Sequence, residues 1–370
     1  MREEYIIGFS SGFFSVVGED EKESLLTLPR KLFKGAVEGV NFTQVDLESI
    51  TEFNEPYLKE GIKRMKKLGM RIGFHGEAAA MGGGEKPIGM LDSCIESHYI
   101  HAHERLIQHI EGCGKLGGEF VNIHPSETTP FIKLPRDLQP TKLVDPWGRP
   151  LKKFLEENPE ILDWAIEQGP INDIMRAEFR INTVEDIMEN LKSHYIQTHP
   201  EGPPPNESNL REEAKKRQKA SLKRLLLTFI STSGLAYGPE MIAYFIIAKW
   251  MQKNKDSLWK DIVGKHIPDD KLVYKDKEWV PAVSSKYIWG HFNPKDPRYK
   301  DPKPLLKKYR IYFVFEAQMG SVGLEGLYRL TRPRDMAFLC KSIGSKYVGV
   351  CFDFEHVLSQ NINPIDEIKS

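Results

Sequence analysis

The stretch Val348-Gly349-Val350-Cys351-Phe352-Asp353-Phe354-Glu355-His356 decides the fold that this sequence predicts. It is a short apolar run, typical of a buried strand, that ends in a carboxylate and is followed three residues later by an imidazole. Three earlier apolar runs end in the same way, at His75, His124 and Glu316. Acidic and imidazole groups at the carboxyl ends of successive strands are how a parallel β/α barrel builds a metal site.

Strand-like runs alternate with helical patterns along the chain, which predicts βα units and a parallel sheet. We expect strands at residues 5–10, 40–45, 71–75, 120–123, 310–315 and 347–352, with helices at 58–68, 91–115 and 333–343. The predicted fold class is α/β, a TIM-type parallel (β/α) barrel. Because such a barrel has eight strands, this one is expected to be incomplete at the C-terminus. Three explanations stay open: a further polypeptide supplies the missing strands, the sheet is open, or the insertion described next contains them.

A long segment separates the fourth and fifth expected strands. Residues 126–306 far exceed an ordinary connection, so we expect an inserted helical subdomain between two barrel parts, residues 1–125 and 307–370. Its helices are expected at 159–168, 184–193, 210–232 and 239–254. The prolines Pro281, Pro294 and Pro297 predict an irregular stretch over 279–299.

The composition is typical of a globular protein without membrane spans. Of the 370 residues 40% are apolar, and no uninterrupted apolar run reaches the roughly 18 residues that a membrane span needs. The four cysteines show no Cys-x-x-Cys spacing, and the N-terminus lacks the features of a secretory signal. Both observations favour reduced thiols and a cytoplasmic protein.

The net charge of zero conceals an uneven distribution. Residues 201–310 carry 23 Lys and Arg against 13 Asp and Glu, a net charge of +10, so the rest of the chain carries −10. A basic segment indicates an anionic partner, and the partner we consider is DNA, bound through Lys215, Lys216 and Lys219. A solvated lysine-rich helix over 211–224 explains the same charges.

The strand-end residues predict a metal centre. Zinc and manganese favour imidazole nitrogen and carboxylate oxygen, and His75, His124, Glu316 and Asp353 provide two of each kind. A carboxylate in the position of Glu316 could bridge two ions. His356 would bind a further ion or orient Asp353.

Other polar features receive no role in this site. Two sets of histidines lack ligand spacing or lie on one helix outside the barrel: His98, His101, His103 and His109, and His194, His199, His266 and His291. The run Gly82-Gly83-Gly84 is interpreted as a flexible loop, because no helix clearly begins there to bind a phosphate. Glu77 and Glu127 are interpreted as loop charges rather than as partners of the nearby histidines.

Three stretches carry a resemblance to a known family. They are Asn122-Ile123-His124-Pro125-Ser126, Glu316-Ala317-Gln318-Met319-Gly320-Ser321, and Gly349 to His356. They resemble the motifs of the endonuclease IV (AP endonuclease family 2) branch of the xylose-isomerase-like TIM-barrel superfamily, with the glutamate loop shortened. The likeness covers roughly residues 1–125 and 308–360 and leaves the insertion out.

The resemblance implies three zinc ions that cleave the phosphodiester 5′ of an abasic sugar. It implies that His75, His124 and Glu316 hold the first ion, that Glu316 also bridges to a second ion held by Asp353, and that His356 serves the third. It makes Glu316 the candidate catalytic residue. The family's later ligands would lie after Ser370, so two of the three ion positions are expected to be incomplete.

Three functions remain open at this stage. The first is a metal-dependent hydrolase, a phosphodiesterase of DNA-repair type. The second is a sugar or sugar-phosphate isomerase or epimerase of the same superfamily, which resembles this chain less because such enzymes usually lack the two histidines at positions 75 and 124. The third is a barrel remnant without activity that serves as an interaction platform.

Overall fold

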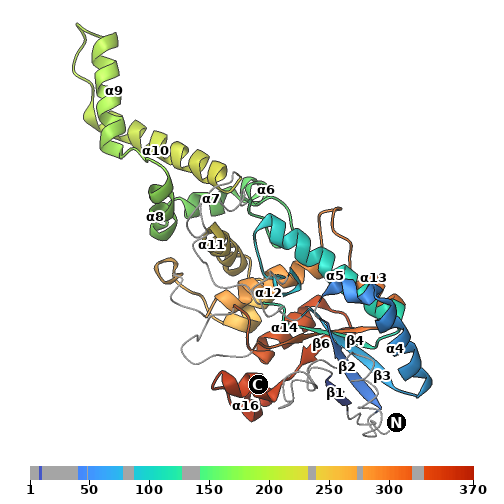
Figure 1. The fold of residues 1–370 in the computed structure, drawn as a ribbon. Helices are drawn as coiled ribbons and strands as arrows, with labels where there is room; N and C mark the ends of the chain where they lie inside the picture. Colours follow the sequence, from blue (N-terminus) through green and yellow to red (C-terminus); the bar gives the residue numbers. More distant parts are fainter. Residues whose placement is uncertain are drawn as a thin grey trace, which may run out of the picture.

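The computed structural model describes residues 8–10, 41–47, 49–77, 87–126, 142–231, 239–272, 278–318 and 329–370. Within them lies a six-stranded parallel sheet with helices packed around it (Figure 1). Its strands are β1 (Gly8–Ser10), β2 (Phe42–Asp46), β3 (Arg71–His75), β4 (Phe120–Ile123), β5 (Tyr312–Glu316) and β6 (Val348–Cys351). All six expected strands are therefore present, although residues 5–7 of the first lie outside the described part.

The strands follow one another across the sheet in chain order, and every neighbouring pair is parallel. The register places Asp46 beside His75 and Glu316 beside Cys351, so the strands end together along one edge. The sheet is open, because β1 and β6 form its two outer strands and no pairing between them closes a barrel in the described residues. A barrel of this kind needs about eight tilted strands to close, so the expected barrel is found only as an open parallel α/β sheet.

Three helices that connect strands match the expected pattern. In α4 (Pro56–Lys67) the buried side chains include Leu58, Ile62 and Met65, which recur at helical spacing on one face. In α5 (Glu96–Leu116) the helix ends at Gly117, whose φ of +67° is a left-handed conformation that favours glycine. The helix α14 (Pro333–Ile343) has the expected bounds.

The connection between β4 and β5 is helical, as the sequence predicts. The α-helices in its described residues are α6 (Leu151–Glu157), α7 (Pro159–Ala165), α8 (Gly169–Glu178), α9 (Val184–Thr198), α10 (Glu207–Phe229), α11 (Pro239–Lys253), α12 (Val280–Phe292) and α13 (Lys303–Tyr309). The boundaries of an inserted subdomain at 126 and 306 stay a prediction.

The expectation of an irregular stretch over 279–299 is wrong. Residues 280–292 form α12, and eleven of its thirteen residues are buried. The reason lies in where the prolines fall. Pro281 occupies the first turn, where its missing N–H leaves no hydrogen bond unmade, and Pro294 and Pro297 come after the helix has ended at Phe292.

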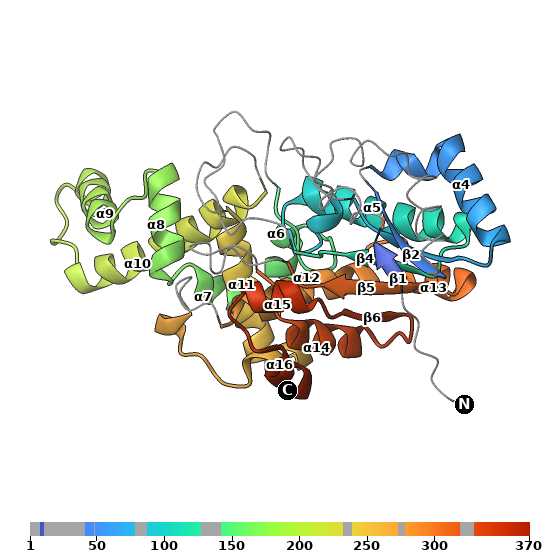
Figure 2. The same cartoon turned by 60° about the horizontal axis from the view of Figure 1, so that its bottom comes forward.

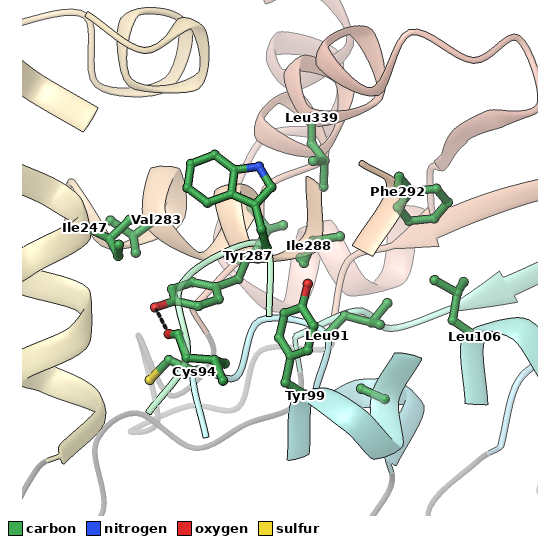
Figure 3. Packing of buried hydrophobic residues seen from close by; sticks show 14 of the residues in the cluster. Leu91, Cys94, Tyr99, Leu106, Ile247, Val283, Tyr287, Ile288, Phe292 and Leu339 are labelled. Carbon is green, nitrogen blue, oxygen red and sulfur yellow. Dashed lines mark hydrogen bonds between the residues drawn. The ribbon is translucent and has the colours of Figure 1, made fainter. Parts of the chain in front are cut away.

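The helix α12 joins the insertion to the sheet. Figure 3 shows Tyr287, Ile288 and Phe292 between side chains that precede or belong to α5 and Leu339 of α14. The Phe292 ring packs edge-on against Phe313 and Phe315 of β5, with centroid distances of 5.8 and 5.9 Å. One apolar core therefore extends from the strands into the inserted helices.

The helices α9 and α10 contact each other and project away from the sheet (Figures 1 and 2). No residue of α9 is buried. The helix begins with a capping box, in which Thr183 and Asp186 satisfy each other's backbone N–H groups. None of the helices in the described ranges is long and apolar enough to cross a membrane.

Candidate metal centre

Glu316 is the centre of the candidate site. It is the last residue of β5 and is only 6% exposed. The neighbouring strand β4 places Asn122 beside it, and the Asn122 side-chain Nδ2 donates a hydrogen bond to Glu316 Oε2. A carboxylate buried in this way needs positive or hydrogen-bonding partners, because burial alone disfavours the charged form.

Two histidines from the ends of β3 and β4 face one oxygen of this carboxylate. Glu316 Oε2 lies 3.5 Å from His75 Nε2 and 4.0 Å from His124 Nε2. The two imidazole rings have their centroids 5.1 Å apart. The Nδ1 atom of His75 is 2.9 Å from the Gly76 carbonyl oxygen, so Nδ1 carries the hydrogen and Nε2 is the nitrogen left to bind a cation.

The other oxygen of Glu316 faces the residues that follow β6. Glu316 Oε1 lies 3.6 Å from His356 Nδ1, and His356 Nε2 lies 4.0 Å from Asp353 Oδ2. Asp353 begins the short helix α15 (Phe354–Ser359), where its Oδ1 accepts the backbone N–H of His356 at 2.9 Å. His356 Nδ1 is also 2.7 Å from the Ala317 carbonyl oxygen, which orients this ring as Gly76 orients His75.

The structure thus brings all five predicted ligands together in two groups that share Glu316. One group is His75, His124 and Glu316, and the other is Glu316, Asp353 and His356; within each, candidate ligand atoms lie within 4.8 Å of one another. Ligand atoms bound tetrahedrally to one zinc ion lie about 3.4 Å apart, given bonds of about 2.1 Å. The observed separations of 3.5 to 4.0 Å between candidate ligand atoms require only small movements, and the mixture of imidazole and carboxylate suits zinc or manganese.

The electrostatics of the centre favour an ion pair between Glu316 and His75. Burial acts to raise the pKa of Glu316, but the hydrogen bond with His75 and the charges of His124 and His356 lower it to about 2. Burial acts to lower the pKa of His75, but its bond with Glu316 outweighs this and raises the pKa. A cation that binds here competes with a proton on His75, so its affinity rises with pH.

The basic residues predicted to bind DNA lie on α10, in the part of the chain that projects away from the sheet (Figure 1). Lys219 Nζ lies 3.2 Å from Asp163 and 3.1 Å from Glu167, so acidic side chains of this chain already neutralise it. Lys215 and Lys216 are exposed. The structure therefore does not place these three lysines with the five candidate ligands.

Several of the remaining polar residues discussed from the sequence have structural partners. Glu77 accepts the backbone N–H of Ile50 at 2.8 Å and its side chain is only 9% exposed, so it is a structural acceptor rather than the plain loop charge that was expected. His103 and His291 contact each other through their Nδ1 atoms at 3.2 Å, and His109 Nε2 accepts the backbone N–H of Glu77. His103 and His109 are buried, unlike residues on an outward helix face. Glu127 and Gly82–Gly84 lie outside the described residues.

Sequence reasoning did not identify the residues that support the site. Asn122 belongs to a motif discussed above but received no role, although its position beside the fifth expected strand was the available signal. Asp92 was not considered, yet its Oδ2 accepts hydrogen bonds from Ser126 Oγ at 2.6 Å and Ser284 Oγ at 3.0 Å. Ser126 follows His124 by two residues, so α12 supports the loop that carries this ligand through buried hydrogen bonds.

A buried ion pair lies beside Asp92. Arg329 Nη2 lies 2.7 Å from Glu240 Oε2, and the Arg329 side chain is fully buried. Tyr244 of α11 donates its hydroxyl hydrogen to the Asp92 carbonyl oxygen at 2.7 Å. Residue 330 is anchored by its N–H to Ser126 Oγ at 3.2 Å. Ser126, which follows β4, and Arg329, which precedes α14, are therefore both held in place by contacts that lead to the inserted helices α11 and α12.

Comparison with known proteins adds little to this geometry. No protein-family model and no curated protein matches the chain. A solved structure described as "Structure of L-ribulose 3-epimerase" aligns with a TM-score of 0.38 and 10% sequence identity, over 95% of this chain and 61% of that one. The chain thus spans less than two thirds of that neighbour's length. At this level of likeness, the function has to be argued from the residues of the chain itself.

Proposed function

We propose that this chain is a metal-dependent hydrolase that cleaves a phosphoester, with zinc or manganese held by His75, His124, Glu316, Asp353 and His356. The observation that carries the proposal is that Glu316 presents one oxygen to each ligand group, Oε2 to His75 and His124 and Oε1 to His356. Two divalent ions bridged by a carboxylate supply the charge that stabilises a phosphoryl group during in-line displacement.

The side chains of the centre suit this role. Glu316, with its pKa held at about 2, is ionised at neutral pH and is available as an acceptor. The carbonyl oxygens of Gly76 and Ala317 orient the rings of His75 and His356. Asp353, 31% exposed, is the most open of the five side chains, compared with 14% or 15% for the histidines. A substrate would approach from the Asp353 side.

The substrate class within this proposal is a nucleic acid with an abasic or damaged site, which the motif resemblance suggests. The positive charge of residues 201–310 supports it, because phosphate contacts need Lys and Arg. The neutralisation of Lys219 by Asp163 and Glu167 weakens that support. The phosphoester chemistry therefore rests on the ligand geometry, and the nucleic-acid substrate rests on sequence alone.

The first test measures metal content and hydrolysis together. Purified wild-type protein is expected to bind about two divalent ions per chain and to hydrolyse an activated phosphodiester and an abasic oligonucleotide. Glu316→Ala should lose both binding and activity. The matched control is Glu355→Gln, because Glu355 is an exposed carboxylate between Asp353 and His356.

Each outcome of this test has a distinct meaning. Hydrolysis of the activated diester without cleavage of the oligonucleotide would retain the hydrolase and remove the nucleic acid. Metal binding with isomerisation of a sugar and no hydrolysis would replace the proposal by the isomerase alternative. Wild-type protein that binds no divalent metal would refute the proposal and leave an interaction platform.

A further inference from the structure

Asn122 occupies a position from which it can control how Glu316 is used. It lies on β4 in register with Val314 of β5 and is 2% exposed. Its Nδ2 donates to Glu316 Oε2, the oxygen that faces His75 and His124. A carboxylate can only accept hydrogen bonds, so the nitrogen of the amide must point toward Glu316 and its oxygen must point elsewhere.

The side-chain oxygen of Asn122 lacks a hydrogen-bond donor among the described residues. Asn122 Oδ1 is buried, and no group among the described residues donates a hydrogen bond to it. The amide nitrogen of Asn122 also donates toward the sulfur of Cys351, where it acts to lower the pKa of that thiol against the larger, opposite effect of burial. A buried acceptor without a donor lowers stability, and a leucine of similar size would avoid this penalty. The polar contacts of the Asn122 side chain are therefore made by its nitrogen, and the bond to Glu316 is the one that reaches the candidate ligands.

We propose that Asn122 is a positioning residue that assigns the two oxygens of Glu316 to the two ligand groups. Its neutral N–H holds Oε2 toward His75 and His124 and leaves Oε1 directed at His356. An amide suits this task, because it adds no charge and does not compete for the cation. Each carboxylate oxygen has about two lone-pair positions, so Oε2 can accept this bond and still bind a metal ion. The inference rests on the proposed metal-binding function.

The test compares zinc affinity in three variants of the full chain by competition with a coloured chelator. Asn122→Leu and Asn122→Ala both remove the donor, and each is expected to weaken zinc binding about 10- to 100-fold, the usual effect of removing a partner that orients a ligand. Val121→Ala is the matched control. Val121 is the neighbouring buried residue on β4, and its side chain points to the opposite face of the strand. It should lower stability while leaving zinc affinity unchanged.

Cobalt(II) absorption provides a second readout, because its visible bands report the arrangement of the ligands. We expect the bands of the Asn122 variants to shift and those of Val121→Ala to remain. Wild-type affinity and spectrum in both Asn122 variants would overturn the positioning role alone, with the hydrolase proposal intact. Wild-type protein that binds zinc, cobalt and manganese no better than the Glu316→Ala variant would overturn both. If Asn122→Leu fails to fold, Asn122→Ala decides the question.

Discussion

Acid is expected to destabilise the fold through buried histidines that the structure keeps neutral. His103 Nε2 donates to the Lys300 carbonyl oxygen at 3.0 Å, so its Nδ1 must accept from His291 Nδ1 at 3.2 Å. His109 Nδ1 donates to the Arg105 carbonyl oxygen at 2.8 Å, and its Nε2 accepts from the Glu77 N–H. A second proton on His103 or His109 would therefore occupy an atom that already accepts a hydrogen bond.

Burial lowers the pKa of both His103 and His109 to about 4 and also lowers the pKa of His291 well below its usual value. A histidine in the unfolded chain has a pKa of about 6.5. The unfolded state therefore binds more protons once the pH falls below 6.5, so the stability held above that value is lost progressively down to about pH 4. Between about pH 7.5 and about pH 5.5, each of these two histidines accounts for a loss of about 1.3 kcal/mol.

Urea unfolding at these two pH values measures the loss directly. The wild-type free energy of unfolding will also reflect His75, whose raised pKa acts in the opposite direction: its contribution is present below about pH 6.5 and is lost as pH rises. The informative quantity is therefore the difference between wild type and variant in the free energy of unfolding lost on acidification. His103→Phe will be less stable at neutral pH but should lose about 1.3 kcal/mol less than wild type on acidification.

His101→Gln is the matched control, because His101 is exposed on the same helix, α5. The reasoning would be refuted if His103→Phe and wild type lost the same amount of stability on acidification. It would also be refuted if His101→Gln reduced the loss as much as His103→Phe did.

Three further predictions concern the site and the sheet. Glu316→Ala should abolish metal-dependent activity more completely than His356→Ala, because Glu316 belongs to both ligand groups; equal residual activity in the two variants would contradict the bridging role. Gly73→Ala should lower the free energy of unfolding by about 1–3 kcal/mol, because the added Cβ would lie 2.3 Å from Phe120 Cε1. Gly349→Ala is the control in the same denaturation series, because the atom nearest to its added Cβ would be 3.7 Å away. Reversing the charge of Lys215, Lys216 and Lys219 should leave zinc affinity unchanged, because these residues lie on α10. If this surface contacts phosphates, the same variant should bind an oligonucleotide more weakly and with a smaller salt dependence. Unchanged oligonucleotide binding would remove the nucleic-acid partner.

The positions of the strands were accessible from the sequence because they depend on local patterns. Runs such as 71–75 and 120–123 are apolar, short and flanked by turn residues, and both were predicted with the bounds that the structure has. Because parallel strands end along one edge of a sheet, it followed that His75, His124 and Glu316 would meet there. Metal binding by these residues stays a prediction, since their proximity does not show that an ion is held.

Other features could be decided only by the tertiary structure. The helix α12 was not recognised, because three prolines lie in or after it, and only the packing of Phe292 against Phe313 and Phe315 shows what stabilises it. Closure of the barrel was also beyond the sequence, since it depends on the tilt and number of strands rather than on any one of them.

Glu316 shows most clearly which features of the site could be predicted from the sequence and which required the structure. The side chains that end the strands, and therefore share one edge of the sheet, could be identified from the sequence, because strand positions and parallel order follow from local patterns. Only the tertiary structure decided that Glu316 turns one oxygen to each ligand group and that Asn122 holds one of those oxygens. The physical reason is that the register between β4 and β5 and the rotation of a buried carboxylate depend on contacts between residues almost 200 positions apart in the chain.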